Sequence, residues 1–247
     1  TILHAILPFK YVDHTHSDAV VTVTNTLEGE GRIREIYGER VVIIPYVMPG
    51  FDLAKDVARI FSEQSTDKTE GMILMNHGIF SFGDDAKESY DRMISLVNEA
   101  ENYLMSKNAW DIEKPEANFK PKNIRNQIAG LRQKISLSIG RPVLMHLTNS
   151  LLGFNFCNKE DVKKIATKGP LTPDHVIRTK RIPMIGRDIN KYNEEYASYF
   201  NKHEINAKAR KTMLDPAPRV ILDKDFGLCA VGKNMSEIGI ISDIYEH

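Results

Sequence analysis

The sequence predicts an α/β fold in which a central mixed sheet is flanked by helices. Over residues 1–110, short runs rich in Val, Ile and Thr alternate with longer segments of helical periodicity, and such alternation is typical of layered α/β domains. Strand-like runs recur at residues 143–147, 219–223 and 228–231. We therefore expect the second half to contribute strands of its own instead of a helical bundle.

Each element of the first half carries a local signal. The stretch "TILHAILPF" predicts a helix end stopped by Pro8, and "KYVDHTHSDAVVTVTNT" predicts a strand that runs into a helix or loop. A buried strand from Val41 to Pro45 is closed by Pro49 and Gly50. The pattern then predicts a helix over 51–64, two short strands joined at 76–78, and a long amphipathic helix over 85–107. We assign these elements to a first domain of residues 1–110.

The rest of the chain divides into a linker and a second region. The segment "DIEKPEANFKPKN" holds two of the 11 prolines, so we assign residues 111–122 as the linker. Residues 123–247 form the second region. Its predicted elements are a helix over 124–140, a strand within 141–150, a helix starting near Thr172, a Tyr-rich helix over 191–207, and a strand, turn, strand and helix over 219–247.

The last of these segments is similar to an earlier one. When "NHGIFSFGDDAKESYDRMI" is placed over "DFGLCAVGKNMSEIGIISD", two glycines and a glutamate coincide at an offset of 149 residues. The apolar positions between the glycines agree in type, but His77 of the first stretch is Phe226 in the second. A degenerate internal repeat and a chance match both account for this similarity.

Composition narrows the class of protein. The 247 residues allow one large or two modest domains. Because 33 Lys and Arg balance 33 Asp and Glu, charge gives no reason to expect nucleic acid or a membrane surface as a partner. No apolar run approaches the roughly 20 residues of a membrane-spanning helix. Two cysteines, Cys157 and Cys229, are too few for a disulfide framework, and we expect a cytoplasmic protein.

Histidines provide the candidate site. In "YVDHTHSDAV", His14 and His16 are two residues apart in a predicted strand, so they point to one face about 6.5–7 Å apart. His77, in the predicted turn, is the leading third ligand. Three nitrogen ligands with open positions are typical of catalytic zinc, whereas structural zinc takes a fourth ligand, usually cysteine. Asp13 and Asp18 are candidates to orient the imidazoles.

Other polar features allow plainer interpretations. A His-x-His pair alone also fits ordinary packing. We take the remaining histidines as core or surface residues: His4, His146, His175, His203 and His247. The basic segment "KGPLTPDHVIRTKR" could reach a phosphate, but a solvated basic helix capped by Thr172 is the simpler interpretation.

Three stretches in order, "DHTHSDAVVTVTN", "VVIIPYVMPGFDLAKDVARIF" and "GMILMNHGIFSFGDDAKESYDRMI", resemble the class II aldolase/adducin family. In that family a His-x-His pair and a later His-Gly bind zinc, so the resemblance implies a class II aldolase-like layered fold and His14, His16 and His77 as metal ligands. The segments "GPLTPDHVIRTKRIP" and "DPAPRVIL" are similar to the extended aldolase region of bacterial proteins that join rhamnulose-1-phosphate aldolase to a short-chain alcohol dehydrogenase. Residues 123–247 would then be an α/β extension and the dehydrogenase would follow residue 247. No G-x-G-x-x-G loop is present here to bind NAD.

The resemblance also implies a reaction. A ketose 1-phosphate such as rhamnulose 1-phosphate would be cleaved to dihydroxyacetone phosphate and an aldehyde, with Zn²⁺ or another divalent metal as Lewis acid. The partner would be a small-molecule sugar phosphate, and we expect a homo-oligomer. The family's catalytic glutamate and its phosphate-binding loops would lie upstream of Thr1, so no catalytic acid is assigned and this segment alone is expected to be poorly active.

Four alternatives stay open. The family includes epimerases, dehydratase-like enzymes and adducin-type binding modules that lack zinc. The fourth alternative is an oxidoreductase activity that resides in a fused dehydrogenase outside this segment. The three histidines argue against the adducin type, because a scaffold has no need of convergent imidazoles.

Overall fold

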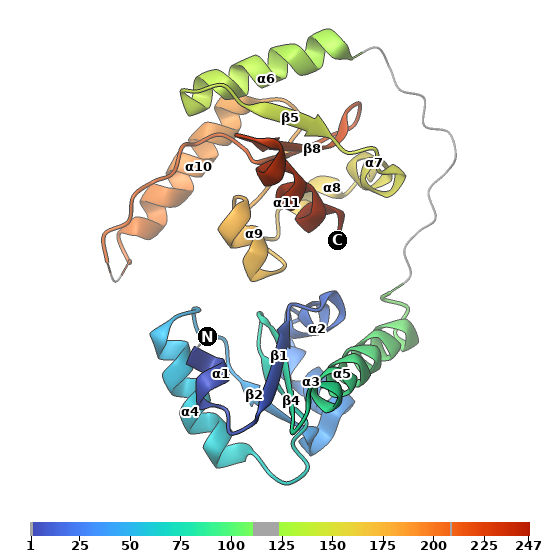
Figure 1. Ribbon diagram of the computed structural model, residues 1–247. Helices are drawn as coiled ribbons and strands as arrows, with labels where there is room; N and C mark the ends of the chain where they lie inside the picture. The colour runs from blue at the N-terminus through green and yellow to red at the C-terminus, as the bar shows by residue number, and fades with distance from the viewer. Residues whose placement is uncertain (1, 111–123, 208) are drawn as a thin grey trace. The chain divides into compact units, whose positions relative to one another are not determined.

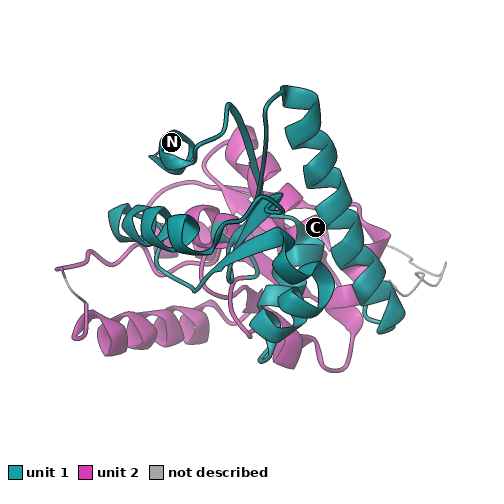
Figure 2. Ribbon diagram, turned by 90° about the horizontal axis from the view of Figure 1, so that it is seen from below, with its two compact units in different colours: residues 1–112, 171–173 teal, residues 113–170, 174–247 magenta. Residues whose placement is uncertain are grey.

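The computed structural model describes residues 2–110, 124–207 and 209–247 (Figure 1). The chain divides into two compact units, residues 1–112 with 171–173 and residues 113–170 with 174–247 (Figure 2). Each unit contains a four-stranded mixed sheet with helices on both faces. The predicted α/β fold, with strands in both halves, is therefore confirmed. The predicted linker at 111–122 lies outside the described residues.

Unit 1 contains the predicted elements and one more helix. In chain order it has α1 (Ile2–Ile6), β1 (Tyr11–Thr15), α2 (Asp18–Thr24), α3 (Gly29–Tyr37), the 3-10 turn η1 (Gly38–Arg40), β2 (Val41–Ile44), α4 (Phe51–Gln64), β3 (Gly71–Leu74), β4 (Gly78–Gly83) and α5 (Ala86–Ser106). Helix α3 was not predicted. The sheet order is β1-β4-β3-β2, with β2 and β3 parallel and the other pairs antiparallel.

The sheet of unit 1 is buried on both faces. Helices α2, α3 and α5 cover one face, where Ile33 and Leu96 pack against Ile79. Helix α4 covers the other face, where Val57 packs in a cluster with Phe80 and Phe82 of β4. Side chains of a strand alternate between faces. Burial on both sides therefore explains why "VVII" and "GMIL" are continuously apolar.

Unit 2 is built on the same plan. Its elements are α6 (Arg125–Ile139), β5 (Leu144–Leu147), α7 (Leu151–Asn158), α8 (Val162–Ala166), α9 (Pro173–Arg178), β6 (Met184–Ile185), α10 (Ile189–Glu204), β7 (Val220–Asp223), β8 (Gly227–Gly232) and α11 (Met235–Glu246). The sheet order is β5-β8-β7-β6, with β6 and β7 parallel. Helices α6 and α10 pack on one face, and α7, α8 and α11 on the other.

Equivalent positions in the two units lie 149 residues apart. This offset relates the first residues of β3 and β7, of β4 and β8, and of α5 and α11. The start of each last helix also has the same capping arrangement: Glu88 accepts a hydrogen bond from the Asp84 backbone N–H at 2.7 Å, and Glu237 accepts one from Lys233 N–H at 2.6 Å. The aligned residues thus have the same structural role, while their common origin stays a prediction.

The basic segment after Thr172 is not wholly the solvated helix that was its simplest interpretation. Lys180 is only 5% exposed. Its ammonium donates a hydrogen bond to the Asp215 carbonyl and lies 3.6 Å from the centre of the Tyr196 ring. Burial, followed by the nearby charge of Arg219, lowers the pKa of Lys180 to about 8. A solvated helix face was therefore wrong for this residue, which anchors the chain that follows α9 to α10.

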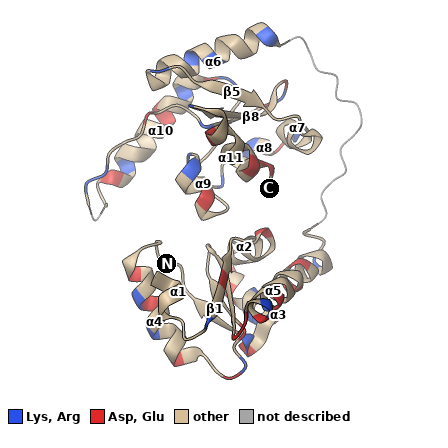
Figure 3. Ribbon diagram, viewed as in Figure 1, with Lys and Arg blue, Asp and Glu red and all other residues tan. Residues whose placement is uncertain are grey.

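The exposed charges are mixed in sign. Acidic and basic residues both occur along α4, α5 and α10 (Figure 3). Among the helices of the described ranges, none combines the length and apolar character that crossing a bilayer requires.

Candidate metal centre

Strand pairing in unit 1 brings the three histidines to one edge of the sheet. His14 lies in β1 opposite Phe80 of β4, and Thr15 lies opposite Ile79. Because the two strands are antiparallel, the end of β1 meets the start of β4. His16 follows the last residue of β1, and His77 directly precedes β4. The imidazoles are thus adjacent although His16 and His77 are 61 positions apart in the sequence.

The three rings converge. Each can offer one ring nitrogen such that all three nitrogens lie within 4.8 Å of one another. The ring centroids are 4.9 Å apart for His14 and His16, 5.4 Å for His14 and His77, and 5.1 Å for His16 and His77. Among the described residues, this is the one group of three or more His, Cys, Asp or Glu that could hold a metal ion.

The orientation of His14 is fixed by two contacts. Its Nδ1 is 2.9 Å from the carbonyl oxygen of Ile79, and its ring stacks on Phe80 with centroids 4.1 Å apart and planes inclined by 16°. A carbonyl only accepts hydrogen bonds, so Nδ1 carries the proton and Nε2 is left with its lone pair. This carbonyl contact is typical of the support behind metal-bound histidine.

The protonation of His14 is also suited to metal binding. The pKa of His14 is lowered to about 4, chiefly by burial. The hydrogen bond with Ile79 raises the pKa, and the nearby His16 and His77 lower it. The ring is therefore neutral at physiological pH. A neutral imidazole is the form that binds a cation.

The turn that carries His77 is held by the residue before it. Asn76 has a left-handed backbone, with φ of 57°, which asparagine tolerates better than most residues. Its amide donates to the carbonyl of Thr24 at 3.3 Å and to the side-chain oxygen of Asn25 at 2.6 Å. The turn is thereby tied to the end of α2, and Asn76 is a positioning residue for His77.

Gly78 allows the close approach of the strands. A Cβ at this position would lie 2.5 Å from the carbonyl oxygen of Thr15, 3.0 Å from His16 Cδ2 and 3.1 Å from His14 Cε1. Distances under 3.0 Å essentially never occur for real Cβ atoms. Any side chain would therefore displace the β1 backbone or the two imidazoles.

Some details differ from the sequence-based expectations. His16 lies just beyond β1, so the prediction that both histidines belong to one strand is wrong by a single residue. Asp13 accepts a hydrogen bond from Ser89 of α5 at 2.6 Å. Successive strand residues point to opposite faces, so its assignment as a support for the imidazoles is wrong, and the Ile79 carbonyl has that role for His14. Asp18 begins α2.

Unit 2 has other residues at the corresponding positions. Phe226 occupies the position of His77 at the offset of 149, and the Arg187 guanidinium lies 3.8 Å from the centre of its ring. Arg187 also makes two hydrogen bonds of 2.7 Å with Asp223. An aromatic ring and a salt bridge thus fill this turn, where unit 1 has an imidazole.

Comparison with known proteins gives the family. Residues 1–104 match the family model described as class II aldolase and adducin N-terminal domain, and residues 122–247 match the model described as aldolase class II, second domain. The chain belongs to the class II aldolase/adducin family. Enzymes of this superfamily are generally lyases or epimerases, and class II aldolases are typically dependent on a divalent metal.

Individual relatives match different fractions of this aldolase-family chain. It is 28% identical over 99% of its length to the uncharacterized oxidoreductase YuxG of Bacillus subtilis (strain 168), and spans 38% of that protein. The N-terminal class II aldolase domain of a conserved Thermoplasma acidophilum protein is 42% identical over 42% of this chain and 46% of that one, with a TM-score of 0.37. An aldolase II superfamily protein from Pseudomonas syringae is 18% identical over 52% of this chain and 53% of that one, with a TM-score of 0.36. The chain therefore spans less than two thirds of each relative.

Proposed function

We propose that this chain is the metal-binding part of a zinc-dependent sugar-phosphate aldolase. The substrate would be a ketose 1-phosphate such as rhamnulose 1-phosphate, cleaved to dihydroxyacetone phosphate and an aldehyde. The observation that carries the proposal is the convergence of three imidazole nitrogens within 4.8 Å in a member of the class II aldolase family.

The donor set fits zinc. Ligands at tetrahedral angles, with zinc–nitrogen bonds of 2.0–2.1 Å, lie about 3.4 Å apart. The nitrogens, now within 4.8 Å of one another, would each have to approach the others by at most about 1.4 Å to reach that spacing. Three neutral ligands leave the cation its full charge and an open position, and the metal, when bound, supplies Lewis-acid polarisation of a substrate oxygen. Neither cysteine of the chain belongs to the histidine cluster, which favours a catalytic over a structural zinc site.

The chain's own residues have defined parts in this proposal. His14, His16 and His77 would hold the metal. The Ile79 carbonyl keeps the His14 Nδ1 protonated, and the Asn76 amide holds the turn before His77. Phe80 covers one face of the His14 ring and keeps water from it. The group that moves a proton on carbon would be the glutamate that the family resemblance implies upstream of Thr1.

The test compares this chain with a longer version that carries the natural upstream residues. The longer, zinc-loaded protein should release dihydroxyacetone phosphate from rhamnulose 1-phosphate, while the present chain should bind zinc and release little. Zinc binding without cleavage of any ketose 1-phosphate by the longer protein would exclude the aldolase and favour the epimerase or dehydratase alternatives.

One observation favours a second candidate. The relative YuxG carries the name oxidoreductase, and more than half of it lies outside the match to this chain. In the natural protein, a dehydrogenase fused after residue 247 would provide such an activity. Assay of the full natural protein with NAD and sugar alcohols, with and without the residues after 247, tests this candidate. The homo-oligomer and the cytoplasmic location stay predictions.

A further inference from the structure

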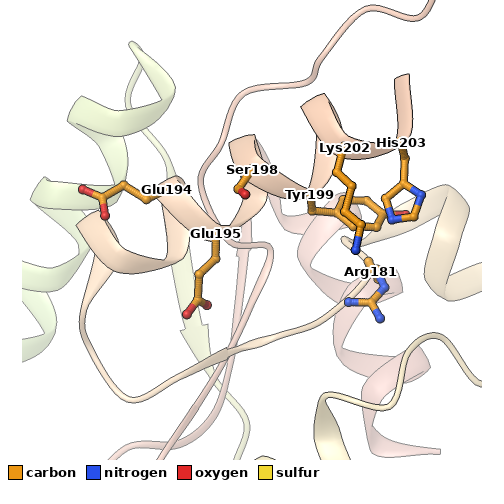
Figure 4. Close-up of a pocket in the computed structure, with 7 residues that line it drawn as sticks. All are labelled: Arg181, Glu194, Glu195, Ser198, Tyr199, Lys202 and His203. Carbon is orange, nitrogen blue, oxygen red and sulfur yellow. The ribbon is translucent and has the colours of Figure 1, made fainter. Parts of the chain in front are cut away.

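A group of charged and polar side chains lies on and beside α10 in unit 2. There, a cavity of about 540 Å³ opens to solvent (Figure 4). Small-molecule sites generally have volumes of about 300–1,000 Å³. The side chains that carry the argument are Arg181, Glu195, Ser198, Tyr199, Lys202 and His203. None of them belongs to the histidine cluster of unit 1.

Helical spacing puts most of these side chains on one face. Residues three, four, seven and eight apart lie along one stripe of an α-helix, and Glu195, Ser198, Tyr199, Lys202 and His203 have these spacings. Glu195 and Lys202 are seven residues apart, or about 10 Å along the axis at 1.5 Å per residue. Glu194 also lines the cavity, so the site has an acidic end with two carboxylates and a basic end.

Arg181 joins this face because the residues on both sides of it are anchored to α10. The Lys180 ammonium lies 3.6 Å from the centre of the Tyr196 ring, and the Ile182 carbonyl accepts a hydrogen bond of 2.9 Å from the Tyr192 hydroxyl. With its neighbours fixed, Arg181 points to the helix surface, where its guanidinium lies 5.2 Å from the centre of the Tyr199 ring.

The basic end is concentrated, and among the described residues its Arg181 and Lys202 have no carboxylate within ion-pair distance. Figure 4 shows Arg181, Lys202 and His203 gathered around Tyr199, while Glu195 lies further along the helix. The His203 ring is 4.7 Å from that of Tyr199. Within the described part of the chain, neither Arg181 nor Lys202 makes an ion pair, whereas Arg187 and Arg219 of the same unit are paired with carboxylates at 2.7 and 2.6 Å. The positive charge here is thus available to an external anion.

We propose that this cavity binds a phosphorylated polyhydroxy compound. The phosphate would contact Arg181, Lys202 and His203, since a guanidinium fork and an ammonium both suit phosphate oxygens. The hydroxyl groups would reach Ser198 and Glu195, whose carboxylate accepts hydrogen bonds. A separation of about 10 Å between the two ends suits a ligand longer than inorganic phosphate. The site is independent of the metal centre and of the aldolase proposal.

Calorimetry on metal-stripped protein tests the proposal. Removal of divalent metals by chelation keeps the histidine cluster from contributing to phosphate binding. The probes are ribose 5-phosphate, inorganic phosphate and ribose. We expect one ribose 5-phosphate per chain, at least tenfold weaker binding of inorganic phosphate, and no binding of ribose.

Variants assign the binding to the cavity. Arg181→Ala and Lys202→Ala should each weaken ribose 5-phosphate binding about tenfold, with the thermal unfolding temperature unchanged because both side chains are exposed. Lys134→Ala, which removes an exposed lysine from α6, is the matched control and should bind like the wild type. Glu195→Gln should weaken ribose 5-phosphate binding and leave inorganic phosphate unaffected.

Three outcomes would overturn the inference. The first is no binding of ribose 5-phosphate at about 10 mM, some ten times the upper end of ordinary KM values. The second is equal affinity for ribose 5-phosphate and inorganic phosphate, which would indicate a bare anion site. The third is wild-type affinity in Arg181→Ala and Lys202→Ala.

Discussion

Gly78→Ala tests the construction of the metal centre with a single added methyl group. Gly78 has no positive φ, so alanine meets no backbone strain and the effect is steric. The new Cβ would lie 2.5 Å from the Thr15 carbonyl oxygen, and ordinary contacts begin at 3.4 Å. The backbones of β1 and β4 must therefore separate by about 0.9 Å at the point where they pair, since overpacked atoms have no other way to relax.

Two quantities should change in this variant. Overpacking of a well-packed site costs about 1–3 kcal/mol, so the urea midpoint of unfolding should fall. Separation of the strands also disturbs the 2.9 Å contact between His14 and Ile79 and displaces both imidazoles beside the new methyl group. Loss of such support typically lowers metal affinity about 10- to 100-fold. Zinc titration against a competing chromogenic chelator measures this change.

Gly227→Ala is the matched control, because Gly227 lies at the equivalent position of unit 2. Its φ of +73° and a Cβ contact of 3.3 Å with Phe154 predict destabilisation. Zinc affinity should stay that of the wild type, because the nearest atoms belong to Phe154 and not to a histidine. Wild-type zinc affinity and stability in Gly78→Ala would refute the close-approach argument.

Two further predictions concern Asn76 and Lys180. Asn76→Gly and Asn76→Ala both remove the hydrogen bonds to Thr24 and Asn25, so both should lower zinc affinity about tenfold. The Asn76→Ala variant should also be about 1 kcal/mol less stable than Asn76→Gly, because φ of 57° strains alanine and not glycine. Equal stabilities of the two variants would contradict this. Lys180 titrates near pH 8 in the folded chain, against a reference pKa of 10.5. The unfolded chain therefore binds more protons between these values, and stability rises with pH across that window. The wild type should gain stability relative to Lys180→Met between about pH 7.5 and pH 10. If the urea midpoints of the two proteins differ by the same amount across this range, the lowered pKa of Lys180 is disproved.

The sequence was most informative where a local pattern and the tertiary environment agree. Helix α4 and the strands β3 and β4 were predicted closely, because burial on both sheet faces leaves continuous apolar runs between clear helical periods. Helix α7 was missed: "LLGFNFCN" contains a glycine and no amphipathic period. Its start is fixed by Ser150, whose hydroxyl accepts a hydrogen bond from the Gly153 N–H at 3.1 Å. Strand β6 has two residues, too few for any pattern.

The three histidines of the metal centre were predictable from the sequence, but the groups that orient them were not. Spacing and family resemblance together selected His14, His16 and His77. The sheet order that brings them together is a tertiary property that no single stretch encodes. Ile79 contacts His14 through its backbone carbonyl, and because every residue has such a carbonyl, the sequence does not indicate this contact. The burial of Lys180 was also missed, because a segment rich in basic residues usually indicates a solvent-exposed surface.

Zinc binding by His16→Ala tests the central claim most directly. The wild type and the variant, each loaded with zinc and dialysed, are compared by metal analysis and by chelator competition, with His146→Ala as a control that removes an exposed histidine from β5. The account predicts one zinc per chain in the wild type and in His146→Ala. In His16→Ala it predicts a loss of affinity beyond the roughly 100-fold of an outer-shell change, with little change in folding. Equal zinc affinity in all three proteins would contradict the account.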